Sequence, residues 1–118
     1  MDTVKIWLDD IRSAPGGWIR TKTVDETIEE LRTGLVEELS LDHDLGEVPD
    51  GMGYDEDENG YTVLLWIEEQ VFNHNFTPPK IKLHTDNASA RVKMKMAIRT
   101  IEKMHRKNKE EDDGSGKD

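Results

Sequence analysis

The chain segment from Val4 to Asp10, VKIWLDD, sets the pattern from which the fold can be predicted. Apolar residues occupy alternate positions up to Leu8, as in a buried β-strand, and two aspartates end the run. Segments 36–44 (VEELSLDHD) and 80–86 (KIKLHTD) repeat this pattern of an apolar run followed by Asp or His. The sequence therefore predicts three strands that each end in a polar cluster.

The connections between these strands predict helices. Thr23 and Glu26 form a capping box before a helix that Gly34 ends, and Asn59 and Asn87 are placed to cap two more. The predicted order is strand 4–8, turn 13–17, strand 18–21, helix from 24, strand 36–41, helix 61–72, strand 80–83 and helix from 88. Strands that alternate with helices indicate a parallel sheet with helices on both faces, a three-layer α/β sandwich.

The length of 118 residues predicts a single domain, which we place at residues 1–106. Within it, residues 47–58 hold six acids and no base, and we interpret them as an acidic loop insertion. Residues 107–118 contain only Lys, Asn, Glu, Asp, Gly and Ser, which cannot bury apolar surface, so a disordered acidic tail is expected there.

The formal net charge of −10 argues against a coat on duplex nucleic acid, because such binding depends on neutralising phosphates. Residues 88–106 nevertheless carry six bases and one acid. This basic segment is either a solvated helix face or a local field that steers a small anionic ligand.

Several classes of protein are excluded by composition. The chain has no cysteine, which removes disulfides, thiolate catalysis and zinc–thiolate sites. It has no run of about 18 apolar residues that could span a membrane, and no secretory signal is visible. We therefore expect a cytoplasmic location without membrane contact, while the oligomeric state stays open.

Ligands of open parallel sheets gather at the carboxyl ends of the strands. Four aspartates fall at two of these ends: Asp9, Asp10, Asp42 and Asp44. Carboxylates are preferred ligands of Mg²⁺ and Mn²⁺, and a cation would relieve the repulsion between them. The sequence therefore predicts a site for Mg²⁺ or Mn²⁺ formed by these four residues.

Two histidines lie at the same strand ends, His43 between two aspartates and His84 after the strand at 80–83. An imidazole can take a proton from water or give one to a leaving oxygen. His43, His84 and Asp42 are therefore the candidate catalytic residues, with the acid and base roles unassigned.

An anion site is predicted beside them, at the start of the last helix, where free backbone N–H groups can bind phosphate. Hydroxyl, amide and guanidinium donors surround this point in the sequence. The candidate phosphate-binding residues are Arg12, Thr85, Asn87, Ser89 and Arg91. Together with the metal ligands they indicate a small phosphate-containing ligand.

The motifs Leu-Asp-Asp-Ile-Arg, Ser-Leu-Asp-His-Asp-Leu-Gly and His-Thr-Asp-Asn-Ala, in this order, resemble the cyclic-phosphate-processing receiver-like domains of bacteria and phages. These are divergent relatives of response-regulator receiver domains. The resemblance implies a receiver or flavodoxin-like sheet of about four strands in the order 2-1-3-4, without the first helix and the fifth strand. It also implies that Asp9 and Asp10 match metal-binding acids, Asp42 a phospho-acceptor and Thr85 a hydroxyl position.

Three hypotheses about function remain. The leading one is a divalent-metal-dependent phosphoesterase that acts on a cyclic nucleotide or on a 2′,3′-cyclic phosphate at an RNA end. The alternative is a protein that sequesters a cyclic nucleotide without cleaving it, in a conflict between phage and bacterial immunity. The third is a degenerate phospho-receiver that accepts a phosphoryl group on Asp42, although the chain ends before the fifth strand and its lysine.

Overall fold

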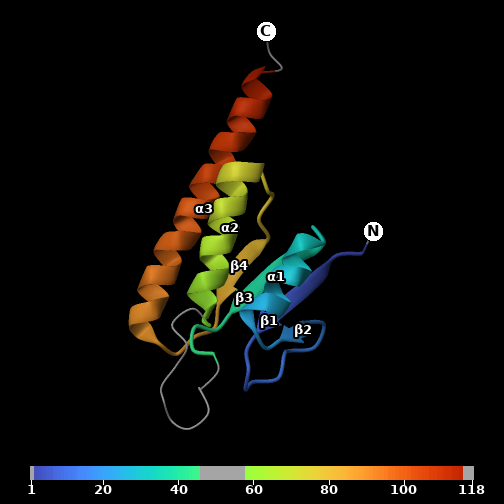
Figure 1. Ribbon diagram of the computed structural model, residues 1–118, viewed down its shortest axis with the longest axis vertical. Helices are drawn as coiled ribbons and strands as arrows, with labels where there is room; N and C mark the ends of the chain where they lie inside the picture. The colour runs from blue at the N-terminus through green and yellow to red at the C-terminus, as the bar shows by residue number, and fades with distance from the viewer. Residues whose placement is uncertain (1, 46–57, 116–118) are drawn as a thin grey trace.

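The computed structural model describes residues 2–45 and 58–115 (Figure 1). The elements run in the order β1 (Val4–Leu8), β2 (Ile19–Thr21), α1 (Val24–Arg32), β3 (Val36–Leu41), α2 (Gly60–His74), β4 (Lys80–Leu83) and α3 (Ala88–Ser115). The predicted strands are therefore confirmed, with the turn in place of a helix between β1 and β2. Of the acidic loop predicted at 47–58, all but Glu58 lies outside the described residues.

The four strands form one parallel sheet in the order β2-β1-β3-β4, which confirms the predicted topology. In the register of this sheet, Leu8 pairs with Leu41, and Leu41 pairs with Leu83. The strands β1, β3 and β4 thus end at the same level. The residues that follow them in the sequence are brought to one edge of the sheet.

The helices form one layer, whereas the sequence predicts helices on both faces. α1 packs against α2, and α2 packs against α3 (Figure 1). Connections between parallel strands are right-handed. The connection from β2 to β3, which contains α1, and the connection from β3 to β4, which contains α2, run in the same direction across the sheet. α1 and α2 must therefore share a face. The step from β1 to β2 runs the other way but contains only a turn, which leaves the opposite face without a helix in the described chain.

The hydrophobic core lies between the sheet and this layer of helices. Alternate residues of the two central strands, Ile6, Leu8, Leu39 and Leu41, are fully buried there. From the helices the fully buried apolar residues are Leu31, Val63, Leu64, Ile67, Val71, Met94 and Ile101. The strand residues between the buried ones point to the other face of the sheet, because side chains alternate along a strand.

That second face is amphipathic rather than apolar. Glu38 of β3 bonds to Lys5 at 3.2 Å and to Lys82 at 2.9 Å. The ring of Trp18, from the loop before β2, lies 5.8 Å from both lysine Nζ atoms and meets Trp7 edge-on at 6.1 Å. The Trp18 indole and the charged side chains of Lys5, Glu38 and Lys82 therefore cover part of the face that carries no helix.

Hydrogen bonds set the limits of the helices as the sequence predicts. The Thr23 hydroxyl accepts from the Glu26 N–H at 3.1 Å, as the predicted capping box requires. The Glu26 carboxylate bonds one residue further back than in that motif, accepting from the Lys22 N–H at 2.8 Å. Asn59 caps α2 by accepting from the Thr62 N–H. The helix ends at Asn75, whose φ of 53° places it in the left-handed region.

The last helix differs from the prediction. Disorder is expected from residue 107, but α3 continues to Ser115 and extends past the end of α2 (Figure 1). Asn108 donates from Nδ2 to the Val71 carbonyl oxygen of α2 at 2.9 Å, which anchors the extra turns. Lys and Glu are also good helix formers, and composition alone did not distinguish a solvated helix from a disordered tail.

No helix in the described ranges 2–45 and 58–115 combines the length and the apolar character needed to cross a membrane.

Candidate functional site

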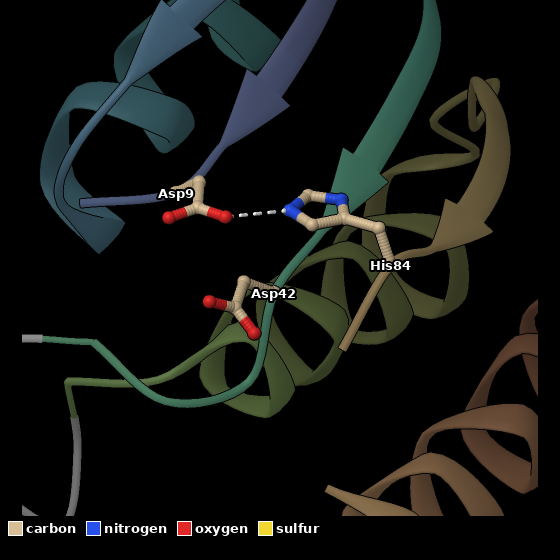
Figure 2. Close-up of side chains that lie close together, drawn as sticks. All are labelled: Asp9, Asp42 and His84. Carbon is tan, nitrogen blue, oxygen red and sulfur yellow. Dashed lines mark hydrogen bonds and ion pairs between the residues drawn. The ribbon is translucent and has the colours of Figure 1, made fainter. Parts of the chain in front are cut away.

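Three strand ends deliver Asp9, Asp42 and His84 to one point (Figure 2). Each extends the sheet by one residue: the Asp9 N–H donates to the Thr21 carbonyl, that of Asp42 to Leu8 and that of His84 to Leu41, each at 3.0 Å. One potential ligand atom from each of the three side chains lies within 4.8 Å of the other two. We call these three residues the strand-end cluster.

Asp9 is held in place by the turn that replaces a helix. Its side chain is only 1% exposed, and its Oδ1 accepts the N–H groups of Ile11 and Arg12, each at 2.8 Å. The other oxygen, Oδ2, is 3.2 Å from Nε2 of His84 (Figure 2). One carboxylate oxygen therefore fixes the turn, while the other faces the cluster.

His84 is positioned by two residues that sequence reasoning missed. Its Nδ1 lies 2.8 Å from the Ser40 hydroxyl, and its ring stacks on Trp7 with the centroids 3.7 Å apart and the planes 5° from parallel. Ser40 belongs to β3, between the strands of the two rings, and its small side chain leaves room for them to meet. Only the register of the sheet reveals that these residues share a face.

The environment shifts the pKa of two members of the cluster. Burial raises the pKa of Asp42, and the Asp9 charge adds to this, while hydrogen bonds from the His43 N–H and the Thr85 hydroxyl act in the opposite direction. Burial lowers the pKa of His84, partly offset by the charges of Asp42 and Asp9. A neutral imidazole beside two carboxylates is a suitable environment for a cation.

The other predicted metal ligands lie outside the cluster. Asp44 accepts at Oδ1 from two groups, Nδ1 of His43 at 2.8 Å and Nδ2 of Asn87 at 3.4 Å, when the imidazole carries its proton on Nδ1. Its backbone forms an isolated bridge to Asn59. Among the described residues, Asp10 and Asp44 do not belong to the group whose ligand atoms converge.

Two of the predicted phosphate-binding residues lie next to the cluster. Arg12 donates to the His84 carbonyl oxygen at 3.3 Å and pairs with the Asp86 carboxylate. Thr85 is 2% exposed, and its hydroxyl is directed toward Asp42. Arg12 and Thr85 thus flank the strand-end cluster.

The other three predicted phosphate-binding residues lie at the start of α3. Asn87 caps α3 by accepting from the Ala90 N–H at 3.0 Å. Arg91 donates from Nη2 to the Thr85 carbonyl oxygen at 2.9 Å. Ser89 is exposed on the first turn of α3. Their role in phosphate binding stays a prediction.

The donor set bears on which cation fits. Two carboxylates and an imidazole suit Mn²⁺, which accepts nitrogen ligands, better than Mg²⁺, which prefers oxygen and retains water. Asp9, Asp42 and His84 thus form a candidate metal-binding cluster.

Comparison with known proteins identifies the family. Searches of curated proteins and of solved structures found no significant match. A family model, the cyclic-phosphate processing receiver domain, matches residues 4–100, which include the strand-end cluster and every predicted site residue. Given this match over most of the chain and the parallel sheet that carries the cluster, the protein belongs to the family of cyclic-phosphate processing receiver domains.

Proposed function

We propose that this protein is a divalent-metal-dependent phosphoesterase that hydrolyses a cyclic phosphodiester. The observation that carries the proposal is the convergence of Asp9, Asp42 and His84 within 4.8 Å at the carboxyl edge of a parallel sheet. Membership of a cyclic-phosphate processing family supports the choice of substrate class.

The reaction adds one water to the cyclic ester. The water oxygen attacks phosphorus, one ester P–O bond breaks, and the leaving alkoxide takes a proton, which gives a ring-opened phosphomonoester. A divalent cation bound here would polarise a phosphoryl oxygen and lower the pKa of a coordinated water. Asp9 Oδ2, an Asp42 carboxylate oxygen and His84 Nε2 are the atoms we propose to hold it.

His43 is our candidate for moving the proton. It follows Asp42 directly, and its Nδ1 lies 2.8 Å from Oδ1 of Asp44. A carboxylate at Nδ1 orients the ring and favours the tautomer in which Nε2 can accept a proton. His84 is less suited to this role in our proposal, since its Nε2 faces Asp9 and its Nδ1 faces Ser40.

Arg12 and Thr85 are our candidates for binding the phosphate oxygens. The Arg12 side chain is 50% exposed, and that of its partner Asp86 is 83% exposed. Such a solvated pair is weak, so a phosphate could replace the Asp86 carboxylate at the guanidinium. The bond from Arg12 to the His84 carbonyl would keep the guanidinium beside the cluster during this exchange.

The test is an assay of the full chain with Mn²⁺ and three substrate types: 3′,5′-cyclic nucleotides, 2′,3′-cyclic nucleotides and short RNAs with a 2′,3′-cyclic phosphate end. We expect a phosphomonoester product, and a loss of more than about a hundredfold in Asp42→Asn, because even outer partners of metal ligands contribute about 10–100-fold. Asp25→Asn, the same substitution at an exposed position of α1, is the matched control.

Three results would overturn this function. The first is the absence of turnover with all three substrates, and the second is an Asp42→Asn variant as active as the control. The third is recovery of intact cyclic nucleotide from the denatured complex, which would assign sequestration. Stable labelling of Asp42 by a small phosphodonor would instead assign the phospho-receiver function.

A further inference from the structure

A groove lies between the edge strand β4 and helix α3, outside the strand-end cluster. It has a volume of about 340 Å³. Ile81 and Leu83 of β4 and Ile98 of α3 provide its apolar surface. Because β4 is the last strand of the described sheet, no described strand covers this side. We call this cavity the β4–α3 groove.

Basic residues line the groove at a regular spacing. Arg91, Lys95 and Arg99 follow one another at intervals of four residues on α3, and Glu102 lies at the far end. With a helix rise of about 1.5 Å per residue, successive bases are roughly 6 Å apart along the axis. This step is comparable with the distance between consecutive phosphates in an extended single strand.

Two of these charges are available for a ligand. In the part of the chain that the structure describes, neither Lys95 nor Arg99 has a carboxylate partner within ion-pair distance. The groove is thus locally positive in a protein whose net charge is −10.

The groove begins beside the strand-end cluster. Arg91, at its near end, donates to the Thr85 carbonyl oxygen at 2.9 Å. Thr85 in turn directly follows His84 of the cluster in the chain. A ligand whose reacting phosphate lies at the cluster could therefore extend past Thr85 and along α3.

We infer that the β4–α3 groove binds the sugar–phosphate chain of a single-stranded RNA whose 2′,3′-cyclic phosphate end reaches the strand-end cluster. The inference rests on the proposed function and selects its substrate: RNA ends rather than cyclic mononucleotides. A mononucleotide has one phosphate, which the cluster itself would take, and it leaves Lys95 and Arg99 without a counterpart. RNA supplies further phosphates for these bases and base or ribose faces for Ile81, Leu83 and Ile98.

The test measures binding without turnover, so that it does not depend on the esterase activity. The full chain is titrated in EDTA with a fluorescent short oligouridylate that ends in a 2′,3′-cyclic phosphate, and separately with 2′,3′-cyclic uridine monophosphate. The test variant is the double substitution Lys95→Gln with Arg99→Gln. Lys107→Gln is the control, because Lys107 lies on the same helix but outside this groove.

The oligonucleotide should bind more tightly than the mononucleotide. Each phosphate contact to a single strand contributes about 0.7 to the slope of log K against log salt, so the double variant should lose about 1.4 of that slope. Between about 50 and 200 mM salt, its affinity should therefore fall about sevenfold less than that of the wild type. The control variant should keep the wild-type slope, and mononucleotide binding should be the same in all three proteins.

Equal binding of oligonucleotide and mononucleotide would overturn the inference, as would an unchanged salt slope in the double variant. A dimer that sedimentation detects for the wild type but not for the double variant would also overturn it, because a second copy of the chain would then occupy the groove. If RNA binds as expected but no substrate is hydrolysed with Mn²⁺, the groove stands and the proposed esterase fails. If only mononucleotides are hydrolysed and RNA does not bind, the esterase function stands and the inference about the groove fails.

Discussion

Gly60→Ala should damage the strand-end cluster although Gly60 is not part of it. Gly60 is the first residue of α2, and its N–H donates to the His43 carbonyl oxygen at 3.1 Å. A Cβ added there would overlap the Asp42 carbonyl oxygen and would lie 3.0 Å from the Asp42 carbonyl carbon and 2.9 Å from the Met94 methyl group. The methionine can move aside, but the Asp42 carbonyl belongs to the rigid end of β3.

The size of the effect follows from these distances. Carbon atoms pack best at about 3.5–4.0 Å, and the overlap with the Asp42 carbonyl oxygen is closer still, so α2 and the end of β3 must separate by at least about 1 Å. Overpacking of this kind costs about 1–3 kcal/mol, and a backbone clash falls at the upper end. Alanine is the better helix former by about 1 kcal/mol, which leaves a net loss of about 2 kcal/mol.

The assay has two parts. Thermal unfolding should show a melting temperature about 8 °C lower, since each kcal/mol shifts a domain of this size by about 4 °C. At a temperature where circular dichroism shows a folded variant, Mn²⁺ binding by calorimetry should be strongly weakened, because Asp42 is displaced. A displacement of about 1 Å can also lower the rate of a catalysed reaction about a hundredfold.

Gly16→Ala is the matched control, because a Cβ at Gly16 has no heavy atom within 4 Å and Gly16 is not at a positive φ. It should keep the wild-type melting temperature within a few degrees. If Gly60→Ala matched Gly16→Ala in both melting temperature and Mn²⁺ affinity, the close approach of α2 to Asp42 would not be what positions the carboxylate.

Two further predictions concern His84. Ser40→Ala should cost about 1–3 kcal/mol in urea unfolding, because it removes the hydroxyl 2.8 Å from a ring nitrogen of the largely buried His84. Ser13→Ala, at an exposed position, should change little, and equal urea midpoints for the two variants would contradict this role of Ser40. Because burial lowers the pKa of His84, the unfolded chain binds a proton at about pH 6.5 before the folded one does, so stability should fall as pH drops below about 6.5. The urea midpoint of His84→Asn should fall less over this range. The raised pKa of Asp42 affects stability with the opposite sign. A fall as large as that of the wild type would show that His84 does not cause the pH dependence.

Most of the secondary structure, and the edge of the sheet that carries the site, can be predicted from the sequence alone. Alternating apolar residues and the polar clusters after Leu8, Leu41 and Leu83 identify the three strands and their ends. The caps Thr23 and Asn59 mark two helix starts, because a cap side chain bonds to backbone only two or three residues away. Such signals are local, so the structures they specify can be predicted without knowledge of tertiary packing.

Which side chains meet depends instead on how the strands pair and pack. Asp9, Asp42 and His84 converge, while Asp44 bonds to His43 instead, although the sequence suggests Asp44 as a metal ligand and His84 as a catalytic residue. The stacking of His84 on Trp7 across β3 depends on register, a property of pairs of strands that are far apart in the chain.

The arrangement of the layers and the length of the last helix also depend on contacts between distant segments. Strand order, with the handedness of the crossovers, places α1 and α2 on one face, and no segment of the sequence carries that information alone. The β4–α3 groove lies beside β4, an edge strand of the described sheet. The contact from Asn108 to Val71 extends α3 past the point where composition predicts disorder. In each case the deciding interaction joins segments that are distant in the sequence, and so only the folded chain reveals it.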